Sequence, residues 1–127
     1  MRVIIAGNRN FLNQALVDAV MKQLIESEWN ITEIVCGMAP GADELGYNWA
    51  LRNRIQIKEF PAEWLKYQGQ AGPIRNIQMA EYAGKDGLLV LFDFGNGKGS
   101  GSMRKEANKR GIKIYEVKDR LGELNNQ

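Results

Sequence analysis

Runs of β-branched and aliphatic residues mark five expected strands along the chain. They cover residues 3–6, 33–36, 56–60, 88–92 and 113–117. The first, second and fourth runs are almost continuously apolar, which is typical of strands that are covered on both faces. The third and fifth runs alternate between apolar and polar residues, so we expect these two strands nearer the edges of a sheet.

Helical patterns fill the gaps between these strands, at residues 12–29, 43–54, 73–83 and 102–110. In the first of them, Leu16, Val20 and Leu24 recur at a spacing of four and give the helix one apolar face. Pro73 suits the first turn of the third helix, and Gly111 suits the end of the fourth.

The alternation of strands and helices predicts an α/β fold. Strands joined by helices favour a parallel sheet with helices on both faces, because right-handed crossovers are nearly obligatory. We therefore expect a single Rossmann-like doubly wound domain over residues 1–127, with a five-stranded, mainly parallel sheet. Residues 95–102 are the one internal segment that looks flexible, and the tail from 118 to 127 is expected to be a short helix or frayed.

Composition narrows the chemistry that this domain can perform. The chain has 127 residues and no histidine, which excludes Ser/His/Asp triads, Cys/His dyads and zinc sites with histidine ligands. Any chemistry must come from carboxylates, arginines, backbone amides or a bound cofactor. We assign no metal and no resident cofactor.

Charge and cysteine content bear on partners and location. The formal net charge is +2, spread along the chain, so nucleic acid is not the favoured partner. The chain lacks an apolar run long enough to span a membrane and begins without the pattern of a signal peptide. Its single cysteine, Cys36, cannot form an internal disulfide, and we expect it to fill space in the core. A reducing, cytoplasmic setting is expected.

Candidate binding residues follow the strands of the expected sheet. In parallel α/β sheets, ligands bind beyond the carboxyl ends of the strands, where helix N-termini present unpaired amides. Glycine, arginine, asparagine and serine gather at this edge, in the loops after the first, second and fourth strands and ahead of the third helix. The candidate ligand-binding residues are Gly7, Asn8, Arg9, Gly37, Met38, Ala39, Gly41, Ala42, Asp43, Trp64, Arg75, Asn76, Gly99, Ser100, Gly101 and Ser102.

Each candidate also has a structural explanation. The loop at residues 37–43 alone is more typical of a turn, but with a second Gly/Ser loop at the same edge it favours a phosphate site. Arg9 and Arg75 can clamp an anion or lie in solvent. Trp64 can stack on a base or pack in the fold. Asp43 can favour its helix through the helix dipole or contact a ribose hydroxyl.

Several motifs carry a family resemblance. They are GNRNF, GMAPGADELGYNWA, FPAEW, AGPIRNIQMAE and KEANKRGIKIYEV, and the likeness that they carry covers nearly the whole chain, from Arg2 to Val117. In this combination the chain resembles the SLOG superfamily, in particular its short YspA-like branch related to cpYpsA proteins. The resemblance implies a Rossmannoid sheet whose glycine-rich loops hold nucleotides or nucleotide-derived ligands. It also implies a nucleotide site lined by Gly7, Arg9, Gly37, Gly41, Ala42 and Asp43.

The same superfamily includes the LOG enzymes, which hydrolyse the N-glycosidic bond of cytokinin nucleotides with an arginine in RKxxM and a glutamate in PGGxGTxxE. Arg75 begins a segment, RNIQM, that is similar to the first motif. At the two positions where the glutamate would fall, this chain has Met103 and Lys105, and Glu106 comes one residue late. The resemblance therefore implies Arg75 and Glu106 as candidate catalytic residues, with Glu63 or Asp43 as other carboxylates.

Three hypotheses follow for the function. The first is a binding module that senses or sequesters a nucleotide or an ADP-ribose-like molecule. The alternative is a nucleotide N-glycosidase, or phosphoribohydrolase, related to LOG enzymes. A weaker alternative is single-stranded DNA binding of the DprA type, through the basic cluster Arg104, Lys105, Lys109 and Arg110, which is otherwise the solvated face of its helix. Superfamily relatives often form dimers or larger assemblies through helix faces, so a homo-oligomer, dimeric or larger, is also among the expectations.

Overall fold

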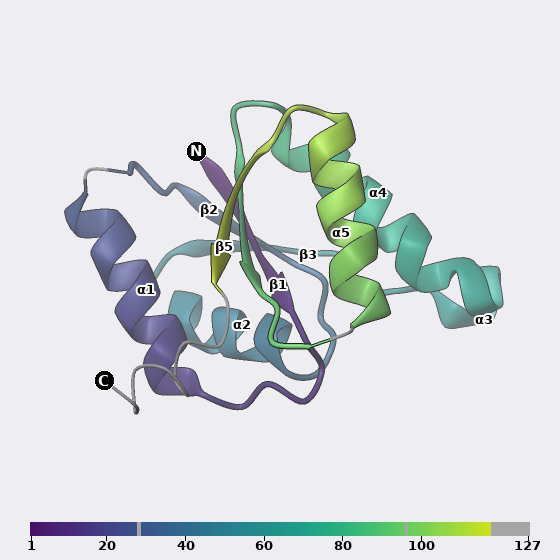
Figure 1. Ribbon diagram of the computed structural model, residues 1–127, viewed down its shortest axis with the longest axis horizontal. Coiled ribbons are helices and arrows are strands. Elements are labelled where there is room, and N and C mark those ends of the chain that lie inside the picture. Colours follow the sequence, from purple (N-terminus) through teal and green to yellow (C-terminus); the bar gives the residue numbers. More distant parts are fainter. Residues whose placement is uncertain (28, 96, 118–127) are drawn as a thin grey trace.

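Five parallel strands form one sheet in the computed structural model, which describes residues 1–27, 29–95 and 97–117 (Figure 1). The strand order is β3-β2-β1-β4-β5. Their bounds are β1 (Arg2–Gly7), β2 (Glu33–Cys36), β3 (Gln56–Glu59), β4 (Leu88–Phe92) and β5 (Lys113–Val117). All five expected strands are therefore confirmed, and so is the Rossmann-like α/β class. The tail expected at 118–127 lies outside the described residues.

The position of each strand agrees with its pattern. β1 and β4 pair at the centre of the sheet, and every residue of β4 is buried. β3 and β5, the two runs that alternate, form the two edges. Successive residues of β1 serve opposite faces, because Ile4 packs in one apolar cluster and Ile5 in the other.

Helices cover both faces of this sheet, as expected. On one face lie α1 (Gln14–Glu26) and α2 (Ala42–Arg52), whose buried residues share a core with Val3, Ile5 and Val90. On the other face lie α4 (Ala71–Ala83) and α5 (Lys98–Lys109), which pack on Ile4, Val35 and Leu89. Trp49 and Cys36 are both buried in the core, as predicted. No helix of the described ranges is long and apolar enough to cross a membrane.

Two helical segments differ from the prediction. The short helix α3 (Trp64–Tyr67) and the 3₁₀ turn at Gln68–Gln70 precede α4, where the sequence indicated a loop. Helix α5 begins at Lys98 rather than at Ser102, so the segment expected to be flexible is helical from Lys98 onward. Ser100 and Met103 are buried in this helix, and their packing offsets the low helix propensity of the glycines around them.

Glycine is required where α2 crosses β1. An ideal Cβ on Gly46 would lie 2.6 Å from the Cγ2 atom and 2.8 Å from the Cβ atom of Ile5, both of which belong to a buried side chain. The absence of a side chain at Gly46 therefore sets how closely the helix approaches the sheet. By contrast, Gly101 in α5 has open space around it.

This contrast predicts opposite effects of the same substitution. Gly46→Ala should lower the free energy of unfolding by about 1–3 kcal/mol, because the new methyl group overpacks the core. Gly101→Ala should raise it by up to about 1 kcal/mol, since alanine is the better helix former and meets no neighbour. Urea unfolding followed by circular dichroism measures both. Equal shifts in the two variants would contradict the close packing at Gly46.

Candidate functional site

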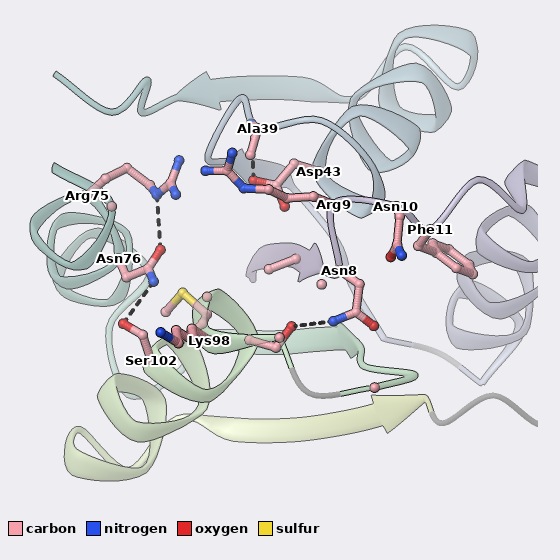
Figure 2. A pocket seen from close by; sticks show the side chains of 18 of the residues that line it. Asn8, Arg9, Asn10, Phe11, Ala39, Asp43, Arg75, Asn76, Lys98 and Ser102 are labelled. Carbon is pink, nitrogen blue, oxygen red and sulfur yellow. Dashed lines mark hydrogen bonds between the residues drawn. The ribbon is translucent and has the colours of Figure 1, made fainter. Parts of the chain in front are cut away.

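A cleft of about 1080 Å³ opens at the carboxyl ends of the strands, at the edge where the sequence predicted a ligand (Figure 2). Its walls come from the loop after β1, the loop before α2, the α3–α4 region and the start of α5. The sequence-predicted residues that line it are Gly7, Asn8, Arg9, Ala39, Asp43, Trp64, Arg75, Asn76, Gly99, Ser100 and Ser102. The candidates outside its lining are Gly37, Met38, Gly41, Ala42, Gly101 and Glu106.

A chain of hydrogen bonds starts at Arg75 and connects three walls of the cleft. The Nη1 atom of Arg75, in α4, donates to the carbonyl oxygen of Gly37, and its Nε atom donates to Asn76 Oδ1 at 3.0 Å. The Nδ2 atom of Asn76 donates in turn to Ser102 Oγ at 3.0 Å, in α5. Arg75 and Asn76 are both buried, so these contacts hold the loop before α2 and the start of α5 against α4.

Asp43 lies in the first turn of α2 and is only 5% exposed. Its Oδ2 atom accepts a hydrogen bond from the backbone N–H of Ala39 at 3.4 Å. Burial raises the pKa of Asp43 to about 6, although Arg75, the Ala39 amide and Arg9 act in the opposite direction. The loop at residues 37–43, predicted as a phosphate site, thus already faces a carboxylate of its own chain.

Gly37 allows this arrangement. An ideal Cβ on Gly37 would lie 2.6 Å from Asp43 Oδ2 and 2.9 Å from Arg75 Nη1. A side chain at this position would therefore push the carboxylate and the guanidinium away from the loop. Burial lowers the pKa of Arg75, and the negative charge of Asp43 opposes that shift. Gly37 is thus a supporting residue behind the cleft.

The N-terminus of α5 is open, and it differs from that of α2 in having no acidic residue in its first turn, whereas the first turn of α2 contains Asp43 and Glu44. The N-cap residue of α5, Gly97, provides no side-chain cap. The backbone N–H groups of Lys98, Gly99 and Ser100 occupy the first turn, where a helix offers no acceptor for them. All three residues line the cleft. The partial positive charge of the helix end and the charge of Lys98 therefore favour an anion at this wall.

The side chain of Asn8, the residue that follows β1, hydrogen-bonds to the first turn of α5. Its Oδ1 atom accepts the backbone N–H of Phe94 at 2.6 Å, and its Nδ2 atom donates to Ser100 Oγ at 3.3 Å. An ideal Cβ on Gly97 would lie 2.5 Å from the same Nδ2 atom, so glycine is needed there. The amide of Asn8, predicted to bind ligand, is thus used largely within the protein.

Arg9 and Trp64 are two of the predicted candidates whose side chains are exposed at the cleft. Arg9 is exposed and forms no hydrogen bond or ion pair with any residue that the structure describes. Figure 2 shows its guanidinium on the same side of the cleft as Arg75 and Asp43. Trp64 is 49% exposed at the rim. Phe11, by contrast, packs against Phe92, with ring centroids 5.3 Å apart.

Lys98 is the charged lining residue that the candidate list omitted. It lies inside the glycine-rich stretch after β4, and it was overlooked because the expected helix began four residues later. The missed residues Asn10, Asn13 and Phe94 also line the cleft. Their signal was weaker, because nothing in the local pattern distinguishes them from ordinary loop residues.

Glu106 lies apart from the cleft. Its carboxylate accepts a hydrogen bond from Arg110, the residue that caps the C-terminus of α5. Arg110 also lies 3.7 Å from Glu81, and Arg104 pairs with Asp93 and Glu116. Two members of the basic cluster considered for DNA binding are therefore paired with carboxylates, rather than all four being solvated. Among the described residues, no group of three His, Cys, Asp or Glu side chains could hold a metal ion.

Helix α1 uses its apolar face inside the protein. Val17, Val20, Met21 and Leu24 are buried in the core. Leu12 and Ile25, both within the stretch expected to form this helix, remain 76% and 44% exposed.

Comparison with known proteins adds two findings. Residues 1–67 match the family described as YspA, cpYpsA-related SLOG, a region that includes Arg9, Asp43 and Trp64 and ends before Arg75. The chain is also 32% identical to the "Gene 61 protein" of Mycobacterium phage D29 over 125 residues, covering 94% of this chain and 98% of that protein. No solved structure matches.

The buried carboxylate of Asp43 predicts a pH-dependent stability. With a pKa of about 6 in the folded protein against an ordinary 3.8, the native state binds this proton more tightly than the unfolded chain. Stability should therefore fall as pH rises from about 4 to about 6 and then level off. Asp43→Asn removes this contribution, so its stability relative to the unmodified protein should increase by about 2–3 kcal/mol across that range.

Urea unfolding at several pH values between 4 and 7 measures this difference. Glu44→Gln is the matched control, because Glu44 is exposed in the same turn of α2. It should leave the pH dependence unchanged. If Asp43→Asn and Glu44→Gln behaved alike, Asp43 would not be buried as described.

Proposed function

The chain belongs to the YspA, cpYpsA-related SLOG family, and from this premise we propose that its cleft binds a nucleotide or a nucleotide-derived small molecule, such as one related to ADP-ribose. The observation that carries the proposal is the open N-terminus of α5 at the wall of the cleft. Family membership supports a nucleotide-related ligand, and the geometry suggests where each part of it is held.

The phosphate lies at the start of α5 in this proposal. Backbone N–H groups of a helix end bind phosphate well, because they combine unpaired donors with the positive end of the helix dipole. The Lys98 ammonium lies at the same place, and Gly99 has no Cβ to block the approach. Arg9 lies on the Asp43 side of the cleft (Figure 2), but its side chain is exposed and has no partner among the described residues, so in this proposal it turns toward the phosphate and binds it with two donors.

The base packs on Trp64 at the rim. This ring is half exposed, so it can cover a flat aromatic group without first leaving the core. Its edge lies beside Gly72, where an ideal Cβ would be 3.8 Å from Trp64 Cη2. A glycine there leaves space next to the ring, which favours a stacked base.

The protein holds its ligand as a sensor or sequestering module rather than cutting it. Glu106, the nearest glutamate to the LOG-type position, is bound to Arg110 and does not line the cleft. Glu63 is also absent from the lining. The two glutamates considered for catalysis thus offer no carboxylate to the bound ligand.

One observation favours the hydrolase as a second candidate function. Asp43 is buried in the cleft, and it is the one carboxylate among the described lining residues. A carboxylate can stabilise the oxocarbenium-like transition state of N-glycosidic cleavage. If the protein cleaves nucleotides, the reaction should therefore depend on Asp43 rather than on Glu106.

A pair of glycine substitutions tests the proposed phosphate site. Purified protein should be stabilised against heat by AMP, by other nucleoside monophosphates or by ADP-ribose. Gly99→Glu should weaken binding at least about tenfold, or about 1.4 kcal/mol, because its carboxylate repels the phosphate. Gly101→Glu is the matched control, since Gly101 is exposed in the same helix but does not line the cleft. It should bind nearly as well as the unmodified protein.

Mass spectrometry of the protein incubated with nucleotide shows whether the nucleotide is only bound or is also hydrolysed. An unchanged nucleotide supports the binding module. Release of free base, lost in Asp43→Asn but kept in Glu106→Gln, would establish the second candidate instead. If no nucleotide stabilises the protein and none co-purifies with it, both functions are excluded.

A further inference from the structure

The buried carboxylate of Asp43 has few hydrogen-bond partners among the described residues, namely the backbone N–H groups of Ala39 and of Asp43 itself. Asp43 is 5% exposed, and its Oδ2 atom accepts the N–H of Ala39. Its Oδ1 atom receives a hydrogen bond from no other residue that the structure describes. Buried polar groups are nearly always hydrogen-bonded, so a buried carboxylate with few partners needs an explanation such as a ligand. Since Asp43 lines the cleft, a further donor can come from the bound molecule.

The surrounding charges decide which chemical group supplies that donor. Neither Arg9 nor Arg75 forms an ion pair with Asp43 within 4.0 Å in the described part of the chain. The Nη1 and Nε atoms of Arg75 are already bonded to Gly37 and Asn76. Arg75 and Arg9 act on the carboxylate only through longer-range attraction, so neither guanidinium occupies it as a direct partner. The carboxylate repels a phosphate placed directly against it and favours a neutral hydroxyl group, which can donate a hydrogen bond.

The place of Asp43 in the cleft fits a sugar. Figure 2 shows Asp43 across the cleft from Lys98, at the start of α5. In the proposed function the phosphate lies at α5 and the base lies on Trp64. The ribose connects the phosphate to the base. Its hydroxyl groups are therefore the hydrogen-bond donors that face the remaining wall of the cleft, where Asp43 lies.

We propose, resting on the proposed function, that Asp43 accepts hydrogen bonds from the 2′- and 3′-hydroxyls of the ligand. The cleft thereby selects ribonucleotides over deoxyribonucleotides. A hydrogen bond to a buried charged acceptor contributes more than one between neutral groups. Its loss also leaves the buried carboxylate with few partners, which adds to the discrimination.

A comparison of ligands tests this on the unmodified protein. Titration calorimetry at pH 7.5, where Asp43 is ionised given its pKa of about 6, measures the affinities of AMP, 2′-deoxy-AMP, 3′-deoxy-AMP and 2′,3′-dideoxy-AMP. The dideoxy compound should bind about tenfold to a hundredfold more weakly than AMP, as expected for losing hydrogen bonds to a charged group. The two singly deoxygenated compounds should fall between them.

The same titrations on two variants assign the effect to Asp43. Asp43→Asn should bind AMP and the dideoxy compound with affinities within about threefold of each other, because it lacks the charged acceptor. Glu44→Gln changes the exposed neighbouring acid and should keep the full discrimination. Circular dichroism of each variant checks that it is folded.

The outcomes separate this inference from the proposed function. If AMP and dideoxy-AMP bind the unmodified protein equally, the role of Asp43 is overturned while nucleotide binding stands. The same holds if Asp43→Asn keeps the full discrimination. If none of the four compounds binds and other nucleotides also fail, the proposed function falls and this inference falls with it.

Discussion

The buried guanidinium of Arg75 is the constraint on which the cleft depends. A buried charge must find hydrogen-bond partners, because leaving water without them is costly. Arg75 donates hydrogen bonds to the carbonyl oxygen of Gly37 and to the side chain of Asn76. The side chain of Asn76 donates in turn to Ser102. These contacts join the loop before α2, helix α4 and helix α5. Three elements far apart in the sequence thereby form one cleft, and only a glycine at position 37 leaves enough room for them.

The same constraint explains the electrostatics of the site. Asp43 and Arg75 attract each other, yet no ion pair within 4.0 Å joins them in the described residues. Burial without close pairing gives little net stability, and it leaves Asp43 with a raised pKa. Perturbed groups of this kind gather at functional sites, because a ligand can supply the interactions that the protein does not. The arrangement is thus better suited to binding than to stabilising the fold.

The central strands could be predicted from the sequence, because parallel strands that are buried on both faces require continuous apolar runs. Leu88–Phe92 is such a run, since all five of its residues are apolar and buried. The start of α5 could not be predicted from the sequence. Gly97, Gly99 and Gly101 have low helix propensity, and the helix forms there because Ser100 is buried and Asn8 holds the helix end. Helix α3 was missed because it has four residues and buries none of them. A cleft does lie at the strand ends, where the sequence predicted a ligand. The sequence did not indicate which of the glycine-rich loops has a carboxylate in its first helical turn facing the cleft, because that depends on the burial of Asp43.

The helix that borders the cleft also bears on whether a bound nucleotide is cut. Counted from Ser100, the LOG-type glutamate would fall at position 103, and Met103 does line the cleft. Its thioether is nearly fully buried and can neither donate a proton nor stabilise a developing cation. Counted from Ser102, the position is Lys105, which is exposed and lies outside the cleft lining. Glu106 is one further residue along, about 100° around the helix from Lys105, and Arg110 holds its carboxylate. In the proposed function, α5 therefore offers its N-terminus to the phosphate but no glutamate to the sugar, so any hydrolysis would have to depend on Asp43 instead.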